Sequence, residues 1–227
     1  MKLVLLPGFD GTGKLLAKFA ASFNPDIELI TVSYPPTMPL GYSELESIAR
    51  SFLPRDEPFF LLGESFSGPI AISIAATAPP GLRGLILCCS FARNPFPWLS
   101  FARRIAFAIP TNAIPIGVLS FLLLGRFSSP ELRSEMEQVI AVVSPAVLQT
   151  RAHAVLSVDA SALVSQIKLP ILYLRASEDR LIPKASAELI ASLALSTKIV
   201  EFEAPHFLLQ VLPFVVTPMV TDFIRIN

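Results

Sequence analysis

Mainly apolar side chains gather in six short runs along the chain, and each run is followed by a segment long enough for a helix. Such runs are typical of strands that are buried on both faces, and their alternation with helical segments indicates a parallel sheet covered by helices on both sides. The pattern therefore predicts an α/β fold. The predicted strands lie at residues 3–6, 27–32, 59–62, 85–89, 171–174 and 199–202. The predicted helices lie at residues 12–23, 43–53, 66–77, 183–193 and 213–226.

The pattern changes in residues 91–168, where no convincing strand occurs. Helical periodicity continues there, but prolines divide the segment into short helices. We expect this segment to form a helical cap inserted into an α/β core of residues 1–90 and 169–227. A row of ordinary surface helices is the alternative. The prolines that divide the segment lie at positions 95, 97, 110, 115, 130 and 145.

Composition argues against one class of function and favours two kinds of surface. The 18 basic and 18 acidic residues cancel, and no basic run is present, so we expect no binding to nucleic acid. Apolar residues make up 52% of the chain, more than a core requires, which favours a substrate groove or a membrane contact. The two cysteines, Cys88 and Cys89, are adjacent in a predicted strand and cannot readily pair with each other.

No segment predicts a membrane span or an export signal. The longest apolar stretch, 113–124, is interrupted by Pro115 and is too short to cross a bilayer. The first apolar run ends at Pro7, which suits a first strand better than a signal peptide. We therefore expect a cytoplasmic protein without stable insertion into a membrane.

A serine stands between a predicted strand and a predicted helix. The apolar run 58–62 ends at Gly63, Ser65 follows two positions later, and an apolar helix begins at once. A serine at the tip of such a turn takes a strained backbone conformation that exposes its hydroxyl, and small residues at Ser67 and Gly68 let strand and helix pass closely. Helix capping is the other common role for a serine in this position. A nucleophile needs further partners.

A serine hydroxyl is a weak nucleophile at neutral pH and needs a base. The chain has two histidines. His206 follows the last predicted strand, at the same sheet edge as Ser65, whereas His153 lies inside a predicted cap helix. We therefore predict His206 as the base and an exposed or packing role for His153.

The imidazole needs an acidic partner, and Asp179 is the best candidate. It lies in the loop after the strand at 171–174, so it reaches the same edge of the sheet; its neighbour Glu178 is an alternative. The chain order Ser65, Asp179, His206, each after a separate strand, is the order of the triad in α/β hydrolases and of no other common triad.

Acyl transfer also needs amides that bind the developing negative charge. The amide of Phe66, at the start of the helix after the serine, is one predicted donor. The second should come from the loop after the first strand, residues 6–13, where Gly8 permits a sharp turn that points the amide of Phe9 inward. Thr12 can cap the following helix without conflict with this role.

With these residues assembled, the chain resembles the α/β-hydrolase superfamily, specifically its small, cap-bearing esterase branch. The matching stretches are LLPGFDGTG, LLGESFSGPIAI, LYLRASEDRLIP and APHFLLQ. The first two also look like part of the acyltransferase group related to plant phytyl ester synthases. The resemblance implies a minimal α/β-hydrolase fold and ester cleavage through an acyl-enzyme, with Ser65 attacking, His206 shuttling the proton and Asp179 orienting His206.

The sequence departs from the family pattern at two positions in these stretches. Ser67 replaces the last glycine of G-x-S-x-G, and Pro7 stands where many relatives have a histidine. The chain also begins at what would be the third strand of larger relatives, which predicts a minimal sheet.

Three alternatives remain open. An acyltransferase or thioesterase would use the same triad with another acceptor or substrate. A nucleotide-binding loop fits the glycines of 8–14, but Leu15 stands where a serine or threonine should hold magnesium. A receptor on this scaffold would be expected to lack a member of the triad. We expect no metal site and no cofactor, because the histidines and cysteines do not form a familiar ligand set.

The substrate is indicated only by large apolar residues in the predicted cap. We expect Phe96, Trp98, Phe121 and Leu124 to line a pocket for a short to medium acyl chain, in a small-molecule ester. The same residues could instead pack the cap onto the core. The large apolar residues that suggest such a pocket are Phe96, Trp98, Leu99, Phe101, Phe107, Phe121, Leu122, Leu123 and Leu124.

Overall fold

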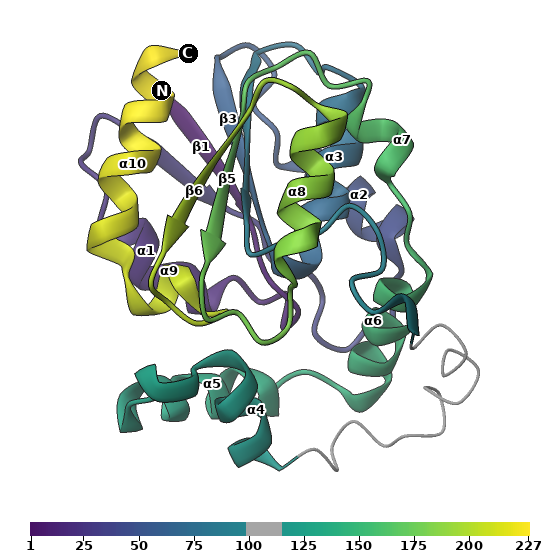
Figure 1. Ribbon diagram of the computed structural model, residues 1–227, viewed down its shortest axis with the longest axis vertical. Coiled ribbons are helices and arrows are strands. Elements are labelled where there is room, and N and C mark those ends of the chain that lie inside the picture. The colour runs from purple at the N-terminus through teal and green to yellow at the C-terminus, as the bar shows by residue number, and fades with distance from the viewer. Residues whose placement is uncertain (99–114) are drawn as a thin grey trace.

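The computed structural model describes residues 1–98 and 115–227 and contains one parallel sheet (Figure 1). The sheet has six strands in the order β2-β1-β3-β4-β5-β6. All neighbouring strands are parallel. The α/β fold predicted from the six apolar runs is thereby confirmed. The strands are β1 (Lys2–Leu6), β2 (Glu28–Thr31), β3 (Phe59–Glu64), β4 (Leu82–Cys88), β5 (Ile171–Ala176) and β6 (Thr197–Phe202).

Helices cover both faces of the sheet, as Figure 1 shows. One face carries α1 (Ala17–Ala21), α9 (Leu208–Val211) and α10 (Pro213–Ile226), which pack on side chains such as Leu3 and Leu5. The other face carries α2 (Tyr42–Ser51), α3 (Gly68–Ala76), α7 (Ser161–Val164) and α8 (Lys184–Leu193), which pack on the alternate residues Val4 and Leu6. Because neighbouring side chains in each central strand enter different cores, most residues of these strands are apolar.

The segment between β4 and β5 adds helices at one edge of the sheet. Figure 1 shows α4, α5 and α6 beyond the ends at which the arrows of β5 and β6 point. A single antiparallel bridge, Arg93 to Asp159, is the only strand-like pairing in the described part of this segment. Leu99, Phe101 and Phe107 lie outside the described residues. The helices are α4 (Ile116–Leu123), α5 (Pro130–Ala141), α6 (Pro145–Ser157) and α7, with a 3-10 turn at Gly125–Phe127.

The parallel arrangement brings the loops after the strands to one edge. Residues after β1, β3, β5 and β6 therefore meet next to α4, α5 and α6, and this edge is where ligands bind in open α/β sheets. No single helix in the described ranges is long and apolar enough to cross a membrane. The pair α5 and α6 would reach that length and composition together, but the two helices meet at a bend of 100°.

Candidate active site

Ser65 lies at the tip of a sharp turn between β3 and α3. Its φ is 46°, in the left-handed region that a serine rarely adopts. The helix starts as a 3-10 turn at Ser65–Ser67 and becomes α-helical only from Gly68. A Cβ on Gly63 would lie 2.7 Å from that of Ala71, and one on Gly68 would lie 1.7 Å from Ser90 Oγ. Only glycine permits strand, turn and helix to pack this closely.

The turn brings Ser65 to His206 and Asp179. Ser65 Oγ lies 2.9 Å from His206 Nε2, and His206 Nδ1 lies 2.8 Å from Asp179 Oδ2. The other carboxylate oxygen of Asp179 accepts hydrogen bonds from the amides of Leu181 and Ile182, both at 2.8 Å. The carboxylate is therefore fixed from two directions while it holds the imidazole.

Ser65, His206 and Asp179 form a hydrogen-bonded relay. Its surroundings determine the charge of the imidazole and of the carboxylate. Burial works to lower the pKa of His206, but the charge and hydrogen bond of Asp179, together with Glu64, hold that pKa above its ordinary value. Burial works to raise the pKa of Asp179, but His206 and the amides of Ile182 and Leu181 keep it below its usual value. Asp179 is thus suited to remain ionised beside an imidazole that gains a proton.

Ser67, the departure from the glycine pattern, has a specific place in this turn. Its buried hydroxyl donates to the carbonyl of Pro7 and lies 3.1 Å from the hydroxyl of Tyr34. The serine at this position therefore links the nucleophile turn to the loop after β1. Pro7, the second departure, supplies the acceptor.

The two residues whose amides are predicted to bind the oxyanion contact each other through their side chains. The rings of Phe9 and Phe66 pack edge to face, with centroids 5.8 Å apart. Gly11 donates its amide to the carbonyl of Gly8 at 3.1 Å, which closes the predicted turn around Phe9. The Phe9 amide donates no hydrogen bond to any residue that the structure describes.

Sequence reasoning missed Glu64, which connects three of these loops. Its buried carboxylate accepts the amide of Gly8 at 3.1 Å and the side-chain amide of Gln210 at 2.8 Å. Burial raises the pKa of Glu64 to about 7, against the opposing effect of the Gln210 hydrogen bond. An acidic residue directly before the nucleophile was the available signal, but its partners on α9 and after β1 were not visible in the sequence.

Comparisons with known proteins agree with this geometry. The model of the alpha/beta hydrolase family matches residues 3–215, most of the chain. The chain belongs to the alpha/beta hydrolase family. No curated protein matches it.

Solved structures resemble this hydrolase over nearly its whole length. An enol-lactonase from Burkholderia xenovorans has a TM-score of 0.85 at 17% identity, with 99% of this chain and 91% of that chain covered. An esterase from Thermogutta terrifontis has a TM-score of 0.85 at 19% identity, covering 99% and 89%. An esterase from Exiguobacterium antarcticum has a TM-score of 0.85 at 14% identity, covering 99% and 92%. At these identities the likeness concerns the fold.

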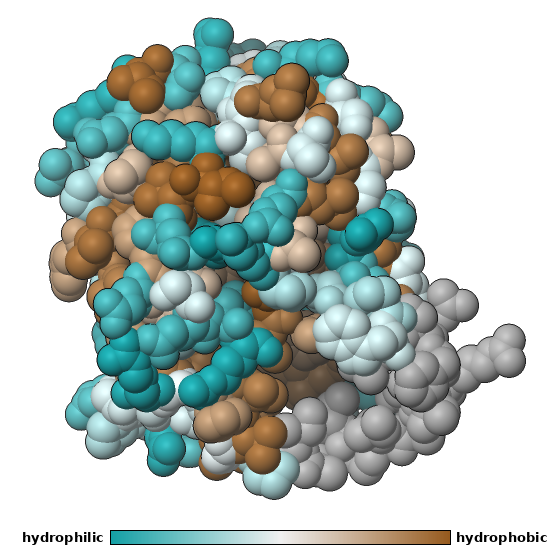
Figure 2. Space-filling model, viewed as in Figure 1, coloured by the Kyte–Doolittle hydropathy of each residue, from teal (hydrophilic) through white to brown (hydrophobic). Residues whose placement is uncertain are grey.

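An apolar cavity of about 380 Å³ opens beside Ser65 and His206 in this hydrolase. On the face drawn in Figure 2, apolar surface (brown) lines the hollow between the sheet and the helices below it. Asp10, Glu64 and Gln210 supply polar groups near the catalytic end. The remaining walls are largely apolar, and α4, α5 and α6 supply about half of them, with side chains that include Leu119, Leu122, Met136, Leu148, Val155 and Leu156.

Of the four predicted pocket residues, Phe96 lines this cavity and the other three do not. Trp98 is 63% exposed and packs edge to face against Phe96. Phe121, on α4, is 60% exposed, and the guanidinium of Arg180 lies over its ring. Leu124 is fully buried at the end of α4. Aromatic content did not reveal which face of each short helix points inward. His153 lies half-buried on α6, away from the cavity wall.

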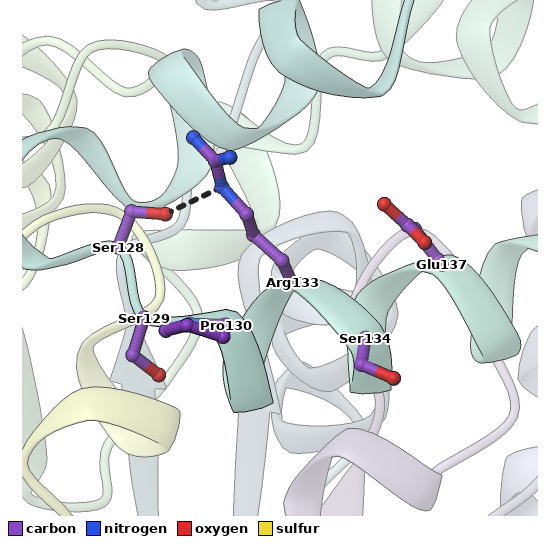
Figure 3. A pocket seen from close by; sticks show the side chains of 6 residues that line it. All are labelled: Ser128, Ser129, Pro130, Arg133, Ser134 and Glu137. Atoms are coloured by element: carbon purple, nitrogen blue, oxygen red, sulfur yellow. Dashed lines mark hydrogen bonds between the residues drawn. The ribbon is translucent and has the colours of Figure 1, made fainter.

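A second hollow, of about 430 Å³, lies at the start of α5 (Figure 3). All but one of the residues that line it have polar side chains, and Arg133 Nε donates to Ser128 Oγ at 2.9 Å. No member of the triad reaches it, so its larger volume does not make it the better candidate for catalysis. The side chains that line it are Ser128, Ser129, Pro130, Arg133, Ser134 and Glu137.

One group in the described ranges could in principle hold a metal ion: Cys89, Asp179 and His206, whose ligand atoms lie within 4.8 Å of one another. Asp179 and His206 already bind each other. The neighbouring Cys88 thiol and burial hold the pKa of Cys89 well above its ordinary value, so this thiol stays neutral and is a poor ligand. The group suits proton transfer better than metal binding. Both cysteines are free, as predicted.

The helices after β4 are attached to two of the loops that carry the triad. Arg126 forms ion pairs with Glu178, next to Asp179, and with Glu203. The amide of Phe207 donates to the carbonyl of Leu123 at 3.0 Å. The end of α4 and the 3-10 turn after it therefore contact the loops after both β5 and β6, next to Asp179 and His206.

Proposed function

We propose that this hydrolase is a serine carboxylesterase that cleaves esters with short to medium acyl chains. The observation that carries the proposal is the hydrogen-bonded relay of Ser65, His206 and Asp179 at the wall of an apolar cavity. Two structural neighbours are esterases by name, which agrees with the proposal.

In the proposed reaction, Ser65 Oγ attacks the ester carbonyl carbon while His206 Nε2 takes its proton. Asp179 stabilises the imidazolium that forms. The amides of Phe9 and Phe66 bind the oxyanion of the tetrahedral intermediate. His206 then passes the proton to the leaving alcohol, and an acyl group remains on Ser65. Water, deprotonated by His206, attacks this acyl-enzyme and releases the carboxylic acid.

The cavity supports the substrate class. Its volume of about 380 Å³ is near the lower end of the roughly 300–1,000 Å³ typical of ligand pockets. Its helical walls carry aliphatic side chains, with carboxylates and an amide only near the catalytic end. A neutral, mainly aliphatic acyl group fits this lining, whereas a charged acyl group would lose hydration without gaining a partner.

Hydrolysis of p-nitrophenyl esters of increasing chain length tests the proposal. We expect kcat/KM to rise from acetate to a maximum at a short to medium chain and then to fall as the chain outgrows the cavity. A preference for charged or polar acyl groups would contradict the substrate class. Product analysis with an added alcohol distinguishes hydrolysis from acyl transfer, because a transferase would yield the new ester in place of the acid.

The two histidines make a matched pair for the same assay. His206→Ala should lower kcat/KM by roughly 10⁴-fold or more, because the base is lost. His153→Ala should leave it near the wild-type value, because His153 lies away from the cavity wall. The reverse result would identify His153 as the base and overturn the assigned relay.

A further inference from the structure

Arg151 on α6 is the largest fully buried side chain described in this protein, and only 1% of it is exposed. A buried guanidinium normally requires a carboxylate partner. The nearby carboxylate of Asp10 instead accepts hydrogen bonds from the amide and hydroxyl of Thr12, at 2.8 and 2.6 Å. Within the part of the chain that the structure describes, no carboxylate forms an ion pair with Arg151, although the charge of Asp10 acts on it from nearby.

The guanidinium binds the backbone of the loop after β1. Its Nη1 donates to the carbonyl of Phe9 at 2.8 Å and to that of Asp10 at 2.6 Å. Gly11 makes room for it: φ is 72° there, and a Cβ would lie 2.5 Å from Nη1. The loop sequence and the arginine, about 140 residues apart, fit each other at this point.

The same guanidinium also faces the ring of Phe66, whose amide is the other predicted oxyanion donor. Its central carbon lies 5.9 Å from the ring centroid of Phe66 and 5.9 Å from that of Tyr34. Arg151 thus contacts both residues whose amides are assigned to the oxyanion hole. It does not line the cavity, so it reaches the reaction only through these residues.

This arrangement is costly for stability. Among the described residues, Nε and Nη2 of Arg151 have no hydrogen-bond partner, and an unpaired buried donor destabilises the fold. Replacing buried charges by apolar side chains of similar size is often neutral or stabilising. A costly group held on the loop that carries the oxyanion amide points to a role in catalysis rather than in folding.

We infer that Arg151 is a positioning residue for the oxyanion hole: its two bonds to the Phe9 and Asp10 carbonyls hold the Phe9 amide toward Ser65. The inference rests on the proposed function. It makes the geometry of the oxyanion hole depend on α6, so the helices inserted after β4 contribute to turnover as well as to substrate binding.

An alkylboronic acid tests this inference, because its boron bonds to Ser65 Oγ and the resulting tetrahedral adduct presents an oxygen to the oxyanion amides. We expect Arg151→Met to raise the dissociation constant of the adduct by about tenfold or more. It should lower kcat by a similar factor and change KM by less than about twofold. These losses are smaller than the roughly 10²- to 10³-fold that follows removal of an oxyanion donor. Arg151→Lys should recover most of both, since one nitrogen makes both carbonyl bonds.

Val164→Ala is the matched control. Val164 is fully buried in the same inserted segment but does not line the cavity, so its truncation lowers stability without touching the loop. Arg151→Gln, whose amide is too short to keep both bonds, replaces Arg151→Met if the latter fails to fold. Unchanged adduct affinity in these Arg151 variants, or an equal loss in Val164→Ala, would overturn the inference. Wild-type protein that binds no boronic acid would instead overturn the proposed function.

Discussion

Glu64, directly before the nucleophile, is an acid whose folded environment favours its neutral form. Its pKa of about 7 in the fold exceeds the ordinary 4.5, chiefly because of burial. Between these two values the folded protein keeps a proton that the unfolded chain has released. Stability must therefore fall as pH rises through this window.

Glu64→Gln should remove this pH dependence. The amide cannot ionise, so the variant should lose less stability than the wild type between pH 4.5 and 7. Urea unfolding at several pH values measures the difference, and Glu188→Gln, on the exposed side of α8, provides the control. If the stability of wild type and of Glu64→Gln changed equally with pH, burial would not raise the pKa of Glu64, which contradicts the prediction.

At the scale of elements, the close packing of β3, α3 and β4 creates the strained serine. Gly68 is where this packing is tightest, since a Cβ there would meet Ser90 Oγ at 1.7 Å. The Ser90 hydroxyl also donates to the carbonyl of Ser65 at 2.6 Å. Displacement of Ser90 would therefore disturb the nucleophile itself.

Two glycine substitutions separate this contact from helix propensity. Gly68→Ala should lower the melting temperature by several degrees and reduce activity, because Ser90 or α3 must shift. Gly117→Ala, on α4, meets no atom within 4 Å and should raise stability by up to about 1 kcal/mol, because alanine favours a helix more than glycine does. Thermal unfolding compares the two variants. A Gly68→Ala protein as stable as Gly117→Ala would contradict the packing described for the turn.

At the scale of the whole molecule, local sequence patterns were enough to predict the sheet and the meeting of the triad. Central strands are buried on both faces, so most of their residues are apolar and the strands stand out in the sequence. The carboxyl ends of parallel strands lie at one edge of the sheet. Chain order alone therefore predicted that Ser65, Asp179 and His206 meet there. The glycines around Ser65 also predicted the sharp turn, because they lie within a few positions of the serine in the sequence.

Contacts between distant segments could not be predicted. Arg151 and Gln210 act on loops far away in the chain, and nothing near them in the sequence identifies the carbonyl or carboxylate that they bind. Three of the four predicted pocket residues do not line the cavity, for a related reason. Phe121 lies on a short helix whose inward face depends on how the inserted segment packs, and composition does not determine this.

Covalent labelling of Ser65 tests the central claim most directly. A fluorophosphonate probe, followed by mass spectrometry of the digested protein, should add one phosphonyl group to the peptide that contains Ser65. Labelling should be absent in Ser65→Ala and strongly slowed in His206→Ala, because the relay activates the hydroxyl. No labelling of the folded wild-type protein, or equal labelling of Ser65→Ala, would contradict the assignment of Ser65 as the nucleophile.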